Sequence, residues 1–175
     1  MTIMSCSFGN NKFPCWIKDG ENYDDLNSDY LYFVGYSSIN KNNNFSERKL
    51  IKSARRHAAT LYNLYILSVY KSKILPLGPT PKSMAFNKCL VKILYEKTVP
   101  YLHDCEIFFY PNSCYEQNIP KCSVYKRMRI SKKIINNTAK ILTSKNEDED
   151  MEKCITFEAK AIEKDFHLFY NPFGN

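Results

Sequence analysis

The chain has 175 residues, of which 44% are hydrophobic and 14% are aromatic. This length fits a single domain with tails, and the aromatic content excludes a disordered polymer, which lacks such side chains. Lys and Arg outnumber Asp and Glu by 25 to 18, which favours anionic partners or, equally, a plain solvated surface.

The N-terminal third of the chain predicts an arm, a strand and a loop. Residues 1–29 are rich in Asn, Asp, Ser and Gly and hold the single Trp, which indicates an extended arm with one aromatic anchor. Residues 30–36, YLYFVGY, are typical of a strand that ends in a turn at Gly35. The polar stretch SSINKNNNF then predicts a loop.

A helix is expected next, because Asn44 and Glu47 have the spacing of a capping box. Small and apolar residues recur behind it at helical spacing: Leu50, Ala54, Ala58 and Leu61. Basic residues fall on the other faces: Arg48, Lys52, Arg55 and Arg56. The stretch LYILSVYKSK predicts a strand, and the prolines of PLGPTP end it.

The rest of the chain predicts two more helices and a hairpin before the C-terminal part. Apolar residues and a lysine predict a helix that ends near Pro100: Phe86, Leu90, Ile93, Leu94 and Lys97. The stretches CEIFFY and CSVYKRMRI predict a hairpin with a long connection from Pro111 to Pro120. Ser131 is expected to cap a helix with one face made of Ile134, Ile135, Thr138, Ile141 and Leu142.

The acidic run NEDEDMEK predicts a solvated linker, followed by an amphipathic helix with Ile155, Ala159, Ile162, Phe166 and Phe169 on one face. Three regions result. Residues 1–29 form the arm, 30–143 an α+β domain, and 144–175 the linker with the last helix. The predicted fold class is α+β, with helices packed on one face of a small antiparallel or mixed sheet.

No catalytic constellation is recognisable. His57, His103 and His167 lie far apart, and none belongs to an HExxH motif. On a strand, His103 and Cys105 would share one face while Asp104 points to the other, so nothing shows that the three groups of HDC converge on one site. The five glycines form neither a dinucleotide fingerprint nor a P-loop. We therefore expect a protein that is not an enzyme and that has no metal site and no cofactor.

The basic stretch YKRMRISKK supports an alternative function. Tyr125, Arg127 and Arg129 would share one strand face, as in sheets that bind single-stranded nucleic acid. Lys132 and Lys133 follow directly. Any half-buried strand shows the same alternation, here with Cys122, Val124, Met128 and Ile130 on the buried face. The alternative is a cytoplasmic domain that binds nucleic acid through Arg127, Arg129, Lys132 and Lys133.

The seven cysteines contain no CxxC pair and are scattered, as disulfide halves often are and as reduced, buried thiols can be. An odd number in an exported protein leaves one cysteine for another role, and Cys6 is the natural candidate. Cys114 and Cys122 flank much of the predicted loop from Pro111 to Pro120, so they are the predicted disulfide pair. Closing a loop of this size contributes roughly 2–3 kcal/mol.

Three stretches carry a family resemblance: PCW at 14–16, YFVGYSS at 32–38 and SERKLIKSARRHAATL at 46–61. They resemble the small bacterial lipoproteins of the Lpp-twenty type, in which a Pro-x-Trp element precedes a strand with a Val-Gly turn and an Ala-rich helix. The matching positions are Pro14, Trp16, Val34, Gly35, Ala54 and Ala58. The hairpin and helix at 105–142 are similar to the family's later half.

The resemblance implies lipid attachment at Cys6, which follows Ile3, Met4 and Ser5. Because Ser7 is not Asp, it also implies the outer membrane. No upstream apolar segment of a leader is present in the sequence. The implied function is a lipoprotein that faces the periplasm, as a structural or adaptor subunit of an envelope assembly such as a secretion-system core complex. Its partners would be other envelope or secretion-complex proteins.

Overall fold

The computed structural model describes residues 14–18, 22–24, 28–40, 46–71, 80–110, 121–144 and 148–170. The chain divides into two compact units. The first comprises residues 1–62 and 101–132, and the second comprises residues 63–100 and 133–175. Each unit is described by itself.

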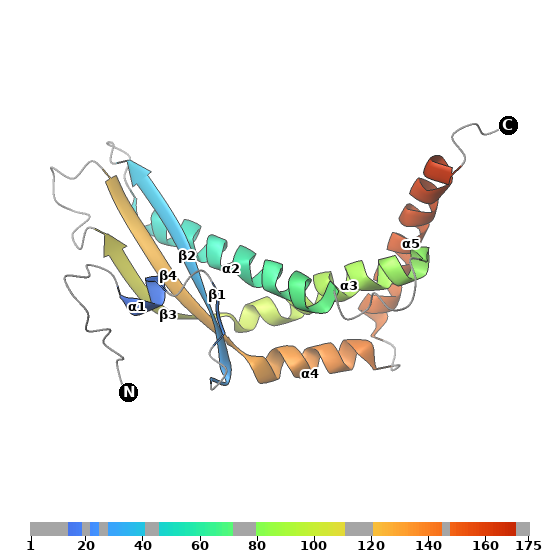
Figure 1. Ribbon diagram of the computed structural model, residues 1–175, viewed down its shortest axis with the longest axis horizontal. Coiled ribbons are helices and arrows are strands. Elements are labelled where there is room, and N and C mark those ends of the chain that lie inside the picture. The colour runs from blue at the N-terminus through green and yellow to red at the C-terminus, as the bar shows by residue number, and fades with distance from the viewer. Residues whose placement is uncertain are drawn as a thin grey trace. The chain divides into compact units, whose positions relative to one another are not determined.

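The first unit contains an antiparallel sheet in the order β1-β2-β4-β3. Its strands are β1 (Asn22–Asp24), β2 (Tyr30–Asn40), β3 (His103–Tyr110) and β4 (Lys121–Ser131). The long strands β2 and β4 lie side by side along their whole length, and β3 borders β4 (Figure 1). A short helix, α1 (Cys15–Lys18), precedes the sheet in the chain. The predicted α+β class is confirmed.

One face of the sheet carries the core of the first unit, because alternate residues of β4 are apolar. Cys122 and Val124 pack against Leu50 and Ala54 of α2 (Glu47–Lys71). Further along α2, the Tyr62 ring meets Phe33 of β2 edge to face, with ring centroids 5.3 Å apart. Such burial of aliphatic and aromatic surface is the main stabilising contribution of a small sheet covered by a helix.

The predicted turn at Gly35 is wrong. Strand β2 continues through Gly35 to Asn40, and it takes in four residues of the predicted polar loop. Each residue of this extension pairs with β4, up to Asn40 opposite Lys121. Glycine is needed at position 35 for close packing against α2, as described below, and not for a change of chain direction.

The strand predicted for LYILSVYKSK is also wrong, because α2 continues to Lys71. Three residues four positions apart, Tyr62, Ile66 and Tyr70, are at most 8% exposed. This spacing is the helical one, and it outweighs the β-propensity of the Tyr, Ile and Val side chains. At the other end, the Ser46 hydroxyl accepts a hydrogen bond from the Lys49 amide at 3.4 Å. Asn44, the predicted cap, lies outside the described residues.

The described helices of the second unit are the end of α2 together with α3 (Pro81–Thr98), α4 (Lys132–Thr143) and α5 (Glu149–Tyr170). A short 3-10 turn, η2 (Val99–Tyr101), follows α3. Thr80 and Ser83 form a capping box at the start of α3, and Pro81 occupies its first turn. Helix α5 begins inside the acidic run that was predicted to be a linker, because acidic residues stabilise the N-terminus of a helix.

Helix α4 buries a narrower face than predicted. Ile135, Ala139 and Leu142 are buried, whereas Ile141 is 61% exposed. The buried residues follow a spacing of three and four, so the predicted face is confirmed at Ile135 and Leu142 and wrong at Ile141.

Candidate functional site

Three residues of the family resemblance, Gly35, Ala54 and Ala58, form the seam between β2 and α2. Val34 and Gly35 are buried, and Ala54 and Ala58 are fully buried. A Cβ atom on Gly35 would lie 1.8 Å from the carbonyl oxygen of Ala54 and 2.6 Å from the amide nitrogen of Ala58. The backbones of strand and helix therefore touch, which only glycine on one side and small residues on the other permit. These residues build the fold.

The same helix covers part of the edge of β2. Strand β1 pairs only with residues 31–33 of β2, so Tyr36 lies beyond it. The Tyr36 amide donates a hydrogen bond to His57 Nδ1 at 3.0 Å, and the Tyr36 carbonyl oxygen is 3.2 Å from the same nitrogen. His57 thus takes the place of a strand partner, and its role in the structure is to satisfy an edge amide.

The residues predicted to bind nucleic acid are only partly brought together. The Arg127 guanidinium lies 4.1 Å from the centroid of the Tyr32 ring, and its Nη1 is 2.8 Å from Glu106 Oε1. Arg129 stacks over Tyr30 at 4.8 Å. The Arg127 side chain is 17% exposed, so most of its surface is used inside the protein.

The two predicted lysines lie in different units. Lys132 belongs to the first unit, where its amide donates to the Asp29 carbonyl oxygen at 2.9 Å, and Lys133 belongs to the second. The structure therefore gathers Arg127 and Arg129 on one sheet face, with Lys132 near the end of β4. It does not define one surface that includes Lys133.

An aromatic row extends this sheet face. Tyr36 and Tyr125 lie opposite each other, with ring centroids 5.0 Å apart, and Phe108 is 6.4 Å from Tyr125. A hydrogen bond with the Ser123 side chain lowers the pKa of Tyr36, whereas burial raises the pKa of Tyr125. Tyr125 is therefore neutral at physiological pH and contributes packing.

A charged cluster that the sequence did not predict lies between α2, β3 and β4. The buried Lys126 places its ammonium 3.0 Å from Asp104, and Arg55 lies 3.8 Å from the other carboxylate oxygen. Asp104 therefore holds two cations. Next to it, burial raises the pKa of the Cys105 thiol, which favours its protonated form.

A disulfide joins Cys89 of α3 to Cys154 of α5, a pair that the sequence did not single out. Ion pairs lie on both sides of it, Lys88–Glu158 at 2.6 Å and Lys97–Asp148 at 2.9 Å. Because the residue number rises along α3 while it falls along α5, the two helices run antiparallel. The two helices are joined by the disulfide, by one ion pair directly beside it and by another at the C-terminal end of α3.

Each of the other cysteine predictions involves one residue that lies outside the described part of the chain. Cys122 is half of a disulfide and Cys105 is a free thiol. Cys114, the predicted partner of Cys122, lies outside the described residues, and so does Cys6. The Cys114–Cys122 pairing and the lipid attachment at Cys6 stay predictions. Pro14 and Trp16 are described, and both are half-buried.

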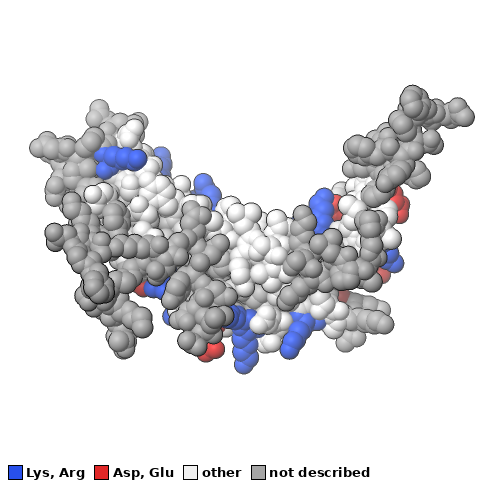
Figure 2. Space-filling view, viewed as in Figure 1, with Lys and Arg blue, Asp and Glu red and all other residues white. Residues whose placement is uncertain are grey.

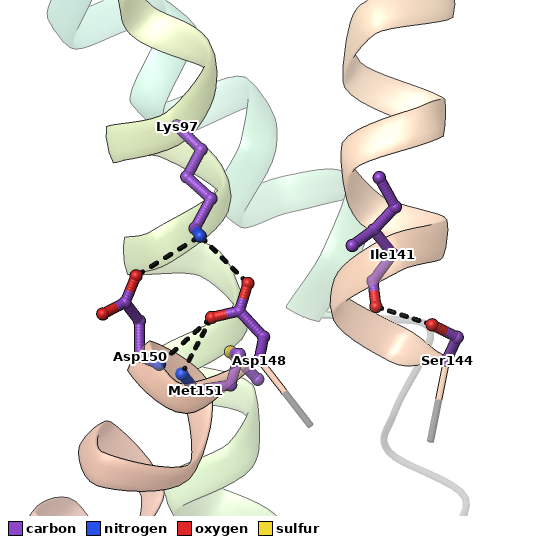
Figure 3. A network of polar contacts seen from close by, with 6 residues as sticks. All are labelled: Lys97, Ile141, Ser144, Asp148, Asp150 and Met151. Atoms are coloured by element: carbon purple, nitrogen blue, oxygen red, sulfur yellow. Dashed lines mark hydrogen bonds and ion pairs between the residues drawn. The ribbon is translucent and has the colours of Figure 1, made fainter. Parts of the chain in front are cut away.

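The best-defined polar network of the second unit lies where α3 meets the start of α5 (Figure 3). Asp148 accepts hydrogen bonds from the amides of Asp150 and Met151, at 3.1 and 3.3 Å, and so caps α5. Lys97 reaches Asp148 and Asp150. The hydrogen bond to Lys97 lowers the pKa of Asp148, and the same bond raises the pKa of Lys97. Nearby, the Ser144 hydroxyl donates to the Ile141 carbonyl oxygen at 2.8 Å.

The described parts of the chain hold neither a metal-binding cluster nor a helix that could span a membrane. No group of three His, Cys, Asp or Glu side chains in these parts is placed to hold a metal ion. None of their helices has the length and apolar character needed to cross a membrane. No family model, no characterised protein and no solved structure matches the chain, so the resemblance to the Lpp-twenty lipoproteins stays a prediction.

Proposed function

We propose that the chain is an exported, non-enzymatic lipoprotein of the bacterial outer membrane, anchored through Cys6 and serving as a structural or adaptor subunit of an envelope assembly. The observation that carries the export part is the disulfide between Cys89 and Cys154. Disulfides persist in oxidising compartments such as the periplasm and are rare in the cytosol. The bonded state of Cys122 adds a second observation of the same kind.

The proposed adaptor role is supported by the structural roles of the residues that the sequence analysis singled out. The seam residues Gly35, Ala54 and Ala58 are occupied with packing, and the HDC stretch supplies a thiol that burial keeps protonated. Arg127 makes its ion pair with Glu106 and its cation–π contact with Tyr32, both within the chain. A scaffold of this kind fits a protein that acts by binding other proteins, with the lipid anchor restricting it to a membrane surface.

The test is made on protein purified from its native host. Free thiols are alkylated in denaturant without a reductant, and the peptides are identified by mass spectrometry. We expect Cys89 and Cys154 to stay unlabelled and Cys105 to be labelled, which serves as the internal control. A second sample, reduced first, must label all three. Labelling of Cys89 and Cys154 without a reductant would reject export, and an unmodified Cys6 would reject the anchor.

A further inference from the structure

The first half of α2 borders a groove of about 1010 Å³ that is open to solvent. Five basic residues line it: Arg48, Lys49, Lys52, Arg55 and Arg56. Glu47 and Asp104 are the acidic residues that line it. The described lining of this concave surface thus has an excess of positive charge. Figure 2 shows Lys and Arg side chains (blue) at several separate places on the described surface, some of them with Asp or Glu (red) beside them.

Most of these cations lack an ion-pair partner within the described residues. Arg55 lies 3.8 Å from Asp104, a carboxylate that Lys126 holds more closely at 3.0 Å. Arg48, Lys52 and Arg56 are exposed, and none of them makes an ion pair with another described residue. Their charges are therefore available to a ligand.

The arrangement is unfavourable for the helix itself. Arg48, Lys52 and Arg56 are four residues apart, so like charges stand above one another on the same face. Arg48 also lies in the first turn of α2, at the positive end of the helix dipole. An anionic ligand in the groove removes both penalties. The internal contacts of the first unit do not explain why the helix has cations here.

The spacing of the cations matches an extended polypeptide. Four residues of an α-helix rise about 6 Å, and two residues of an extended chain span about 6.6 Å. Carboxylates on alternate residues of an extended segment would therefore meet Arg48, Lys52 and Arg56 in turn. The apolar side chains of Ile51 and Ala59 also line the groove, where they would contact the residues of the segment that lie between the carboxylates.

Other anionic ligands fit this lining less well. Single-stranded nucleic acid is bound by proteins that stack bases on aromatic rings, and none of the described residues that line the groove is aromatic. Helices that bind membranes present large apolar side chains such as Trp, Phe and Leu on one face, and the described lining has none of these either. Three acidic residues of the run NEDEDMEK are already engaged, since Asp148 and Asp150 pair with Lys97 and Glu149 pairs with Lys153.

We propose that this groove binds an acidic, extended segment of a partner protein, with carboxylates on alternate residues. The inference rests on the proposed adaptor function and deepens it, because it names the chemistry of a partner. The residues that recognise the segment are Arg48, Lys52 and Arg56, while Arg55 is held in part by Asp104.

The test uses the full chain and a fluorescein-labelled peptide of alternating Glu and Ser residues, with alternating Gln and Ser as the uncharged control. Binding is followed by fluorescence anisotropy at low and high salt. The triple variant Arg48→Gln, Lys52→Gln, Arg56→Gln should weaken binding by about tenfold or more, because each exposed ion pair contributes about two- to fivefold. A matched variant, Lys140→Gln, Lys160→Gln, Lys164→Gln, removes the same charge from exposed positions of α4 and α5 and should change binding by less than about twofold.

A second variant separates binding from folding. Lys52→Glu places a carboxylate one turn from both Arg48 and Arg56, which stabilises the helix and repels the probe. We expect an unfolding midpoint that is equal or higher, together with weaker peptide binding. This opposite response is the signature of a ligand site, since damage to the fold would lower both.

Four results would overturn the inference. The first is equal weakening by the two triple variants, which would show unspecific attraction. The second is tighter binding of a single-stranded oligonucleotide of equal charge, the third is capture by vesicles of anionic phospholipid, and the fourth is self-association that Lys52→Glu removes. The last three name different occupants of the groove. Free thiols at Cys89 and Cys154 in the host protein would reject export and leave the peptide measurements standing, so the two failures are distinguishable.

Discussion

The contact of β2 with α2 can be tested by adding one methyl group. In Gly35→Ala the new Cβ would lie 1.8 Å from the Ala54 carbonyl oxygen, a distance that real Cβ atoms do not reach. The nearest neighbours are backbone atoms of a helix, so no side-chain rotation relieves the overlap. Strand and helix must separate by about 1 Å or more, which also loosens the close packing of buried residues on both sides of the seam.

The expected loss follows from that displacement. Overpacked substitutions in a core cost about 1–3 kcal/mol, and more when the backbone has to move. We therefore expect Gly35→Ala to lower the free energy of unfolding by about 3 kcal/mol or more. Since a domain has only about 5–15 kcal/mol of stability in total, this loss shifts the urea midpoint strongly.

Urea unfolding followed by far-UV circular dichroism measures the effect. Asn40→Ala, at the exposed end of the same strand, is the control and should stay within about 0.5 kcal/mol of the natural protein. Adding Ala54→Gly to Gly35→Ala should not restore stability, because the overlap is with the carbonyl oxygen of Ala54 and not with its methyl group. A loss below about 1 kcal/mol, or full rescue by Ala54→Gly, would refute the reasoning.

Three further predictions concern the second unit and the arm. Replacing Cys89 and Cys154 by Ser should cost about 4 kcal/mol in urea unfolding, since the bridge closes a loop with a sequence separation of 65, and equal stability would contradict this. The pKa of Asp148 is lowered in the folded chain, so its carboxylate stabilises the fold at pH values above its ordinary pKa of 3.8, and this contribution is lost as the pH falls below that value. The pKa of Lys97 is raised, so its ammonium group contributes stability at pH values below its ordinary pKa of 10.5. Asp148→Asn should therefore lower the thermal midpoint at pH 7 and much less at pH 2, and equal effects would refute the pairing. Trp16 is half-buried, so Trp16→Ala should cost about 1–2 kcal/mol and the native emission should be blue-shifted, whereas fully solvated emission would reject the packing.

Periodicity predicted the elements in which one side of a helix or strand is buried. In α3, the predicted face contains Leu90, Ile93 and Leu94, and all three are at most 5% exposed. In β4, the alternation that suggested a half-buried strand is present, with Met128 and Ile130 at most 1% exposed. These patterns are local consequences of 3.6- and 2-residue repeats, so the sequence alone is enough to find them.

The missed features depend on contacts between distant segments. LYILSVYKSK has the composition of a strand, and its helical state follows from the continuous buried row that ends at Tyr70. Gly35 is common in turns, and its strand position becomes clear only when α2 is packed above it. The pairing of Cys89 with Cys154 requires α3 and α5 to be antiparallel, which no spacing along the chain predicts.

The basic groove was missed for a similar reason. Arg48, Lys52 and Arg56 were recognised as residues on the outer faces of a helix, a position that is ordinary for cations. Asp104 of β3 lines the groove together with them. Its ion pair with Arg55 distinguishes that residue from the cations that have no such partner. Only the folded first unit shows which cations lack partners.

The cross-link between Cys89 and Cys154 also determines how the chain would carry tension. Between Cys89 and Cys154, the shortest covalent path is the disulfide itself, because it bypasses the intervening segment with β3, β4 and α4. Tension applied across these two cysteines is carried by the bridge and not by that segment. When the disulfide is reduced, the tension passes through that segment instead. The separation of 65 residues then adds up to about 220 Å of extensible chain between the two cysteines.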